Sequence, residues 1–217
     1  MKWSHLTVLG LALAGPAHSE DIIDVLRRSQ QQRLEALKPS QDEARAQVVR
    51  ATFDKLFQVL HPDAAVELRV VGSGSYAETM HGQLIVANES LADLPEGERL
   101  FIIAHEIGHA AGGHWAQMGR VYKRWVPGDV TQDKTDPVSG LLGRDASGLS
   151  HRQEYAADAY AFQALGKLGW PQDVAFSAFM RQGLQQDSAT HPGTRKRIAS
   201  LRAAQAGAQP LSVEEAE

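Results

Sequence analysis

Residues 100–114 read LFIIAHEIGHAAGGH, and this stretch decides how the rest of the chain is interpreted. His105 and His109 are four residues apart, so on an α-helix they lie on one face, one turn apart. This spacing suits two ligands of a zinc ion, and Glu106 beside them can act as general base toward a metal-bound water. The flanking residues are mostly apolar, as in a buried helix. Because unpaired buried polar groups are costly, a metal site is favoured over a core helix whose histidines bond to backbone carbonyls.

Length and composition limit the classes of protein that this chain can be. Its 217 residues are enough for one domain with a sizeable hydrophobic core. The formal charge is −4, and no basic stripe is present, which argues against nucleic acid as a partner. Cysteine is absent, so thiolate ligands and disulfides are excluded. Any metal site must therefore be built from His, Glu and Asp.

The first 19 residues have the pattern of a secretory signal peptide. Lys2 provides a positive charge, residues 6–14 form a short apolar core, and Ala17 and Ser19 suit cleavage before Glu20. The alternatives are an uncleaved anchor or a buried first helix. No later run is apolar over a length that would span a bilayer. We therefore expect a periplasmic or secreted protein without an integral membrane segment.

The apolar pattern predicts an α+β fold that is mostly helical, with a small antiparallel sheet of about three strands. Alternation predicts the strands, which form a meander with a tight turn at His81-Gly82: 66–71, 75–80 and 83–87. Helical spacing predicts the helices, with Gly112-Gly113 interrupting the central one: 21–37, 42–60, 95–111, 114–126, 151–168, 171–180 and 192–204.

Two segments lack a regular apolar pattern. Residues 127–150 are rich in Gly, Asp, Ser and Thr, and we predict a long loop there. Such a loop is either a lid or inhibitory plug over the site or a mobile surface loop. The tail at 207–217 is small and acidic and is predicted to be disordered.

A catalytic zinc site needs a third protein ligand, and His114 is the first candidate. A metzincin pattern, HExxHxxGxxH, would put its third histidine at position 115, which is Trp115. His114 is one residue too early, and on a continuous helix it would lie on the opposite face from His105. The metzincin interpretation is therefore disfavoured.

Glu154 and His191 are the other two candidates for the third ligand. Glu154 and Asp158 lie four residues apart on one face of an Ala-rich segment, 153–161. Two carboxylates on the inner face of such a helix need cationic partners or a metal, although a solvated acidic stripe would show the same pattern. Glu154 as ligand, with Asp158 orienting a histidine, follows the usual construction of metal sites.

Three motifs in order resemble the zinc metallopeptidases of the HtpX and CAAX-prenyl-protease type, a gluzincin family. The motifs are the HEIGH sequence, Glu154-x-x-x-Asp158, and His191-Pro192 followed by Arg197. The resemblance covers roughly residues 66–201. It implies a metallopeptidase domain over residues 20–206 with one Zn²⁺ per chain.

The resemblance also implies a role for each site residue. The implied zinc ligands are His105, His109 and Glu154. Glu106 is the implied general base, and Asp158 is implied to support the ligands. His191 and Arg197 are implied to be catalytic, because a cationic or hydrogen-bonding group near the metal can stabilise the oxyanion or hold the substrate.

Together these features predict a secreted zinc endopeptidase that cleaves envelope proteins. We expect the substrate to bind in extended form along strand 75–80 as an added strand. The chain departs from the family in having Tyr76-Ala77 where an Asn-Ala pair is common. It has no repeat domain, so a recruiting module would be a separate protein. The alternatives are a non-catalytic, chaperone-like zinc module, or a latent enzyme in which the 127–150 loop or His191 occupies the open metal position.

Overall fold

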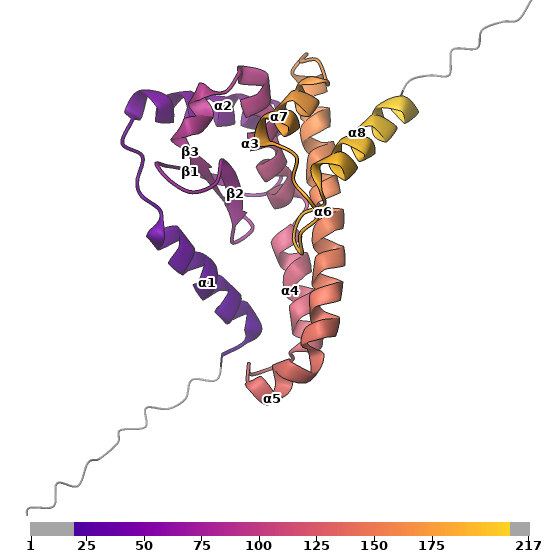
Figure 1. The fold of residues 1–217 in the computed structure, drawn as a ribbon. Coiled ribbons are helices and arrows are strands. Elements are labelled where there is room, and N and C mark those ends of the chain that lie inside the picture. Colours follow the sequence, from indigo (N-terminus) through magenta and orange to yellow (C-terminus); the bar gives the residue numbers. More distant parts are fainter. Residues whose placement is uncertain (1–19, 209–217) are drawn as a thin grey trace, which may run out of the picture.

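The computed structural model describes residues 20–208, and the predicted signal peptide and residues 209–217 lie outside this range. The described part of the chain consists of helices arranged around one small sheet, which confirms the predicted mostly helical α+β class (Figure 1). Between residues 20 and 208, none of the helices combines the length and the apolar composition needed to cross a membrane.

The first two helices begin where aspartates cap them. In α1 (Ile22–Ala36) the Asp21 carboxylate accepts a hydrogen bond from the backbone N–H of Ile23 at 2.8 Å. In α2 (Glu43–Leu60) the Asp42 carboxylate accepts one from the N–H of Arg45 at 3.0 Å. Such caps satisfy N–H groups that lack a partner within the helix. Helix α2 packs on the central helix, whereas α1 lies against α4 at the other end of the molecule (Figure 1).

The sheet is mixed, so the predicted antiparallel meander is wrong about the direction and the neighbour of the first strand. Strands β1 (Glu67–Val71), β2 (Ala77–Met80) and β3 (Leu84–Asn88) have the order β1-β3-β2. The turn at His81-Gly82 makes β2 and β3 an antiparallel hairpin, as predicted, but β1 runs parallel to β3. Strand β3 is the most apolar and most buried strand, so it takes the central place, where both its edges are paired. Strand β2 is left at an edge.

Helix α3 (Glu96–Ala111) forms the centre of the hydrophobic core and follows the short 3-10 helix η1 (Glu89–Asp93). It packs most extensively on α6 (Ser139–Lys167). The two helices approach closely because Gly108 faces Ala157 and Tyr160. A Cβ at Gly108 would lie 3.1 Å from the Tyr160 Cβ and 3.2 Å from the Ala157 Cα. Gly108 of the HEIGH sequence and Ala157 of the Ala-rich segment thus lie at the same close contact between α3 and α6.

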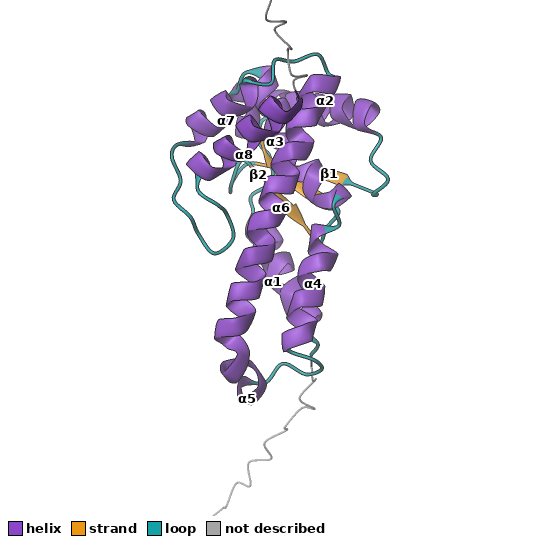
Figure 2. Cartoon of the chain, turned by 90° about the vertical axis from the view of Figure 1, so that its right-hand side faces the viewer, coloured by secondary structure: helices purple, strands orange, loops and turns teal. Residues whose placement is uncertain are grey.

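The predicted loop at 127–150 is wrong, because most of this segment is helical. Helix α4 (His114–Trp125) is followed by α5 (Gln132–Thr135), the 3-10 helix η2 (Asp136–Val138) and the first half of α6. Helices α4 and α6 lie side by side and extend away from the sheet, with α5 at the tip (Figure 2). The first half of α6 is largely exposed, so it lacks the apolar period by which helices are predicted. The lid and plug hypotheses for this segment are therefore not supported.

Two further helices close the fold beside α3 and α6. Helix α7 (Val174–Gln182) packs on α3, and α8 (Thr194–Ala208) packs on α6 and α7. Residues 183–193 between them are irregular and carry His191 toward the C-terminal part of α3. Helix α8 continues to Ala208, two residues into the segment that was predicted as a tail.

Candidate metal centre and active-site cleft

Three side chains from α3 and α6 converge on one point. The Nε2 atoms of His105 and His109 lie 3.0 Å apart. The Glu154 carboxylate approaches them, with Oε1 3.3 Å from the His109 Nε2 and Oε2 3.6 Å from the His105 Nε2. Ligands bound at roughly 2.0–2.1 Å in a tetrahedral zinc site are separated by roughly 3.3 Å. The spacing of the three groups therefore fits a single metal ion.

The state of Glu154 supports a metal at this point. The residue is 4% exposed, and its Oε2 atom is buried without a hydrogen-bond partner. Burial raises the pKa of Glu154, but the hydrogen bond with His109 and the positive charges of His105 and Arg197 lower it to about 2. Arg197 approaches the Glu154 Oε2 only to 3.4 Å, and an ionised carboxylate oxygen without a hydrogen bond is costly in a protein interior unless a cation binds it. Two imidazole nitrogens and a carboxylate are also a donor set that zinc accepts.

Asp158 and Arg197 contact the candidate metal ligands and hold them in place. Asp158 is fully buried, and its Oδ1 lies 3.0 Å from the Nδ1 of His105. Arg197 donates from Nε to the Asp158 Oδ2 at 2.7 Å, and its Nη1 lies 3.4 Å from the Glu154 Oε2. Burial raises the pKa of Asp158, yet the hydrogen bonds from Arg197 and His105 lower it overall. A carboxylate at Nδ1 fixes the histidine tautomer that leaves Nε2 free to bind a metal.

His114 also contacts this centre, contrary to the expectation that it lies on the opposite face. That expectation assumed a continuous helix, whereas the chain turns at Gly112 and Gly113, the latter with φ +60°. His114 therefore folds back, and its Nδ1 lies 2.9 Å from the Nδ1 of His109. A Cβ at Gly112 would lie 2.4 Å from the His114 Nε2, so glycine there leaves room for the His114 imidazole. Burial and the positive charge of His109 lower the pKa of His114 to about 4.

Glu106 is anchored by a residue that the sequence did not indicate. The hydroxyl of Thr79, on the edge strand β2, lies 2.7 Å from the Glu106 Oε2 and 2.9 Å from the Glu106 carbonyl oxygen. Thr79 belongs to no sequence motif, and its position beside Glu106 depends on how the sheet packs against α3. Nothing in the local sequence could have identified it.

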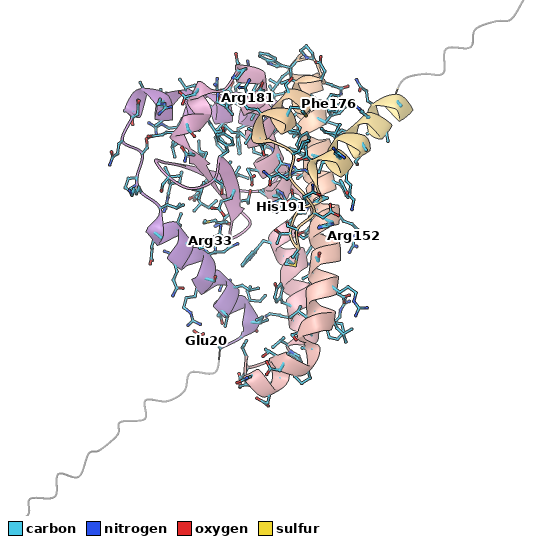
Figure 3. All side chains as sticks on the ribbon, in the orientation of Figure 1. Glu20, Arg33, Arg152, Phe176, Arg181 and His191 are labelled. Carbon is cyan, nitrogen blue, oxygen red and sulfur yellow. The ribbon has the colours of Figure 1, made fainter. Side chains whose placement is uncertain are left out.

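A cleft passes over the metal centre, with β2 on one side and His191 on the other. It consists of two hollows of about 320 and 460 Å³, which share His105, Glu106, Glu154 and His191. His191 is largely exposed at the rim, with its Nε2 3.5 Å from the Glu154 Oε1 (Figure 3). The remaining lining differs at the two ends, with Trp115, Met118 and Gly82 at one and Tyr76, Phe101 and Phe179 at the other.

Helix α1 extends this cleft beyond the predicted motifs. Arg33 lines both hollows and pairs with Glu78 on β2. Gln30 lines one hollow, and its Oε1 accepts a hydrogen bond from the backbone N–H of His81 at 2.7 Å. Both contacts hold α1 against the β2–β3 hairpin.

All seven residues singled out from the sequence lie within this one region. Those that bear on the metal point are His105, His109, Glu154, Asp158 and Arg197. Glu106 and His191 line the cleft above it. The structure adds Thr79, and it also brings in His114, which the sequence analysis considered as a ligand and disfavoured.

Comparison with known proteins gives one result. Residues 39–205, which are most of the chain, match the sequence profile of peptidase family M48. This region includes the three motifs but not α1. A search of curated protein sequences finds no match.

Proposed function

The chain belongs to peptidase family M48 and is thereby a metallopeptidase, and we propose that it is a zinc endopeptidase with His105, His109 and Glu154 as the zinc ligands. The observation that carries this proposal is the buried Glu154 carboxylate, whose Oε2 atom has no hydrogen-bond partner and whose two oxygens lie 3.3 and 3.6 Å from the Nε2 atoms of His109 and His105. We further propose that the substrates are envelope proteins, since residues 1–19 have the pattern of a signal peptide.

Glu106 is the general base of the proposed reaction. Zinc held by the three ligands would supply a Lewis acid that polarises the scissile carbonyl and lowers the pKa of a water. Glu106 accepts the proton of the attacking water and then delivers it to the amine that leaves. The Thr79 hydroxyl at the Glu106 Oε2 holds the carboxylate in place for both transfers.

His191 and Arg197 differ in what they can contribute. His191 is exposed at the rim of the cleft, so it can reach the carbonyl oxygen of a bound peptide and stabilise the negative charge that develops there. Arg197 is only 14% exposed and is engaged by Asp158 and Glu154. Its role in this proposal is to position the ligands and balance their charge.

The substrate is proposed to bind along β2. In the order β1-β3-β2 this strand has one edge without a partner strand among residues 20–208, and Ala77, Glu78 and Thr79 line the cleft. An extended peptide can pair with such an edge through its backbone. Peptides N-methylated at alternate positions test this, because they lose the donors that a strand pairing needs. Unchanged cleavage of every N-methylated peptide would exclude this binding mode.

Glu106→Gln tests the function itself. We expect the purified wild type to bind one zinc ion per chain and to cleave casein. The variant should keep the zinc but lose activity by roughly 10²- to 10⁴-fold, the usual contribution of a general base. Zinc retention in both proteins without cleavage by the wild type would favour the non-catalytic module instead.

A latent enzyme is the second candidate, because the His191 Nε2 lies 3.5 Å from a ligand oxygen and is close enough to compete for the open metal position. His191→Ala separates the two roles. If His191 stabilises the oxyanion, the variant loses activity on casein. If it occupies the metal position, the variant gains activity.

A further inference from the structure

A second concave surface lies on the α4–α6 arm, separate from the cleft. This groove has a volume of about 570 Å³, and four arginines line it: Arg120, Arg124, Arg144 and Arg152. The cleft uses other residues of the same helices, among them Met118 and Gln153. Arg152 projects from α6 on the side away from α1 (Figure 3).

The four arginines form a strip along the groove, contrary to the expectation that the chain has no basic stripe. Arg120 and Arg124 are one turn apart on α4, and Arg144 and Arg152 are two turns apart on α6, about 12 Å by the helical rise. The helices are antiparallel, since Trp125 bonds to Asp145 near one end and Gln153 bonds to the carbonyl of His114 near the other. Arginines of both helices therefore occupy the same length of groove.

The charge of this strip is not balanced within the described part of the chain. None of the four arginines forms an ion pair or donates a hydrogen bond there, whereas seven of the other eleven arginines pair with carboxylates: Arg27, Arg28, Arg33, Arg45, Arg50, Arg181 and Arg197. Asp145 is the one carboxylate in the lining, and it accepts a hydrogen bond from the Trp125 indole. Four cations against one anion stand out in a chain of net charge −4.

The floor of the groove indicates what kind of anion fits. Val121 and Leu149 line it and are less exposed than the arginines, and Gly148 adds no side chain to fill it. A flat lipid surface would meet the arginines at the rims without covering this floor. An amphipathic helix laid into the groove covers the apolar floor and brings its flanking carboxylates to the guanidinium groups. Arginine also binds carboxylates through two parallel hydrogen bonds, which lysine cannot do.

We propose that the α4–α6 groove binds an acidic amphipathic helix of a partner protein. The site is distinct from the metal centre, so the proposal does not depend on catalysis. It would hold a second protein on the arm while the cleft stays open to substrate.

A labelled synthetic helix tests the proposal. The probe is a peptide of about 20 residues, with leucine at positions i, i+3, i+4 and i+7 and glutamate elsewhere, and fluorescence anisotropy measures its binding to the full chain. We expect saturable binding that weakens at least about tenfold between roughly 50 and 300 mM salt. Arg120→Glu/Arg152→Glu should weaken it at least about tenfold. A control, Lys38→Glu/Lys167→Glu, makes the same change in net charge at exposed lysines outside the groove and should bind like the wild type.

Three outcomes would overturn the proposal. One is no binding of the acidic peptide by the wild type at low salt. Another is an equal loss in the lysine control, which would reduce the effect to net charge. The third is arginine-dependent binding of phosphatidylglycerol vesicles without binding of the peptide, which would make the groove a membrane contact. All four arginines are exposed, so circular dichroism and casein cleavage should be unchanged in both double variants.

Discussion

The two halves of α6 have the same backbone conformation, but they differ in whether their charged side chains have partners. Residues 153–167 are largely buried against α3 and α8, and the carboxylates of Glu154 and Asp158 are surrounded by His105, His109 and Arg197. Residues 139–152 pack mainly on α4 and carry arginines without partners among the described residues. The buried half thus balances its charge internally, and the exposed half leaves its charge available to another molecule.

Arg197→Met, which changes a side chain in contact with the buried half of α6, should lower the free energy of unfolding most. It removes the cation that faces two buried carboxylates, Asp158 and Glu154. Loss of one partner of a buried ion pair costs about 3–5 kcal/mol. Urea unfolding of the metal-free protein measures this loss. Arg152→Met is the control from the exposed half, and it should change the free energy of unfolding by less than about 0.5 kcal/mol. Similar unfolding of the two variants would contradict the contrast between the halves.

Glu154→Ala should remove the stabilisation that zinc gives. With zinc at about 100 times its Kd, the wild-type free energy of unfolding should rise by about 2.7 kcal/mol. The variant lacks one of the three proposed ligands, so its affinity should fall and most of this rise should disappear. Thermal unfolding with and without zinc measures the difference. Asp145→Ala, in the exposed half of α6, should keep the full rise in Tm. An undiminished rise in Glu154→Ala would exclude Glu154 as a ligand.

The buried half was predictable because its functional residues lie in short sequence motifs. The four-residue spacings of His105 with His109 and of Glu154 with Asp158 need only helical geometry to be interpreted. The Ala-rich composition of residues 153–161 is a further local signal, because small residues permit a close helix contact. Such signals are local, so they can be recognised without knowledge of the fold.

The rest depends on long-range packing, which leaves no local signal. Residues 139–150 form a helix with no buried position, and without an apolar period they resemble a loop. The place of β3 between β1 and β2 follows from its burial, which chain order does not reveal. Thr79 reaches Glu106 only because of that sheet order. His114 was misplaced because two glycines turn the chain rather than extend the helix.

His114→Ala tests whether the turn after α3 supports the metal centre. The His114 imidazole contacts the Nδ1 of His109, the ring nitrogen that faces away from the metal point. Removing such a support lowers metal affinity by about 10- to 100-fold. Competition with a chelating dye measures the zinc affinity directly, without reference to catalysis. His114→Asn, which keeps a hydrogen-bonding group, should recover part of the affinity. His151→Ala is the control, since His151 bonds to the Ser188 carbonyl and should leave the zinc affinity unchanged.

The smallest effects come from glycines, and here the two regions should respond with opposite signs. Gly143 lies in the exposed half of α6, where a Cβ would meet nothing within 4 Å. Gly143→Ala should therefore stabilise the protein by about 0.5–1 kcal/mol, because alanine loses less backbone entropy in a helix. In Gly108→Ala the new Cβ would lie 3.1 Å from the Tyr160 Cβ and 3.2 Å from the Ala157 Cα. Overpacking of this kind costs about 1–3 kcal/mol. Urea unfolding of both variants gives the two signs. If Gly108→Ala were also stabilising, α3 and α6 would have room to separate, and the close contact that sets the ligand spacing would not be a requirement of the fold.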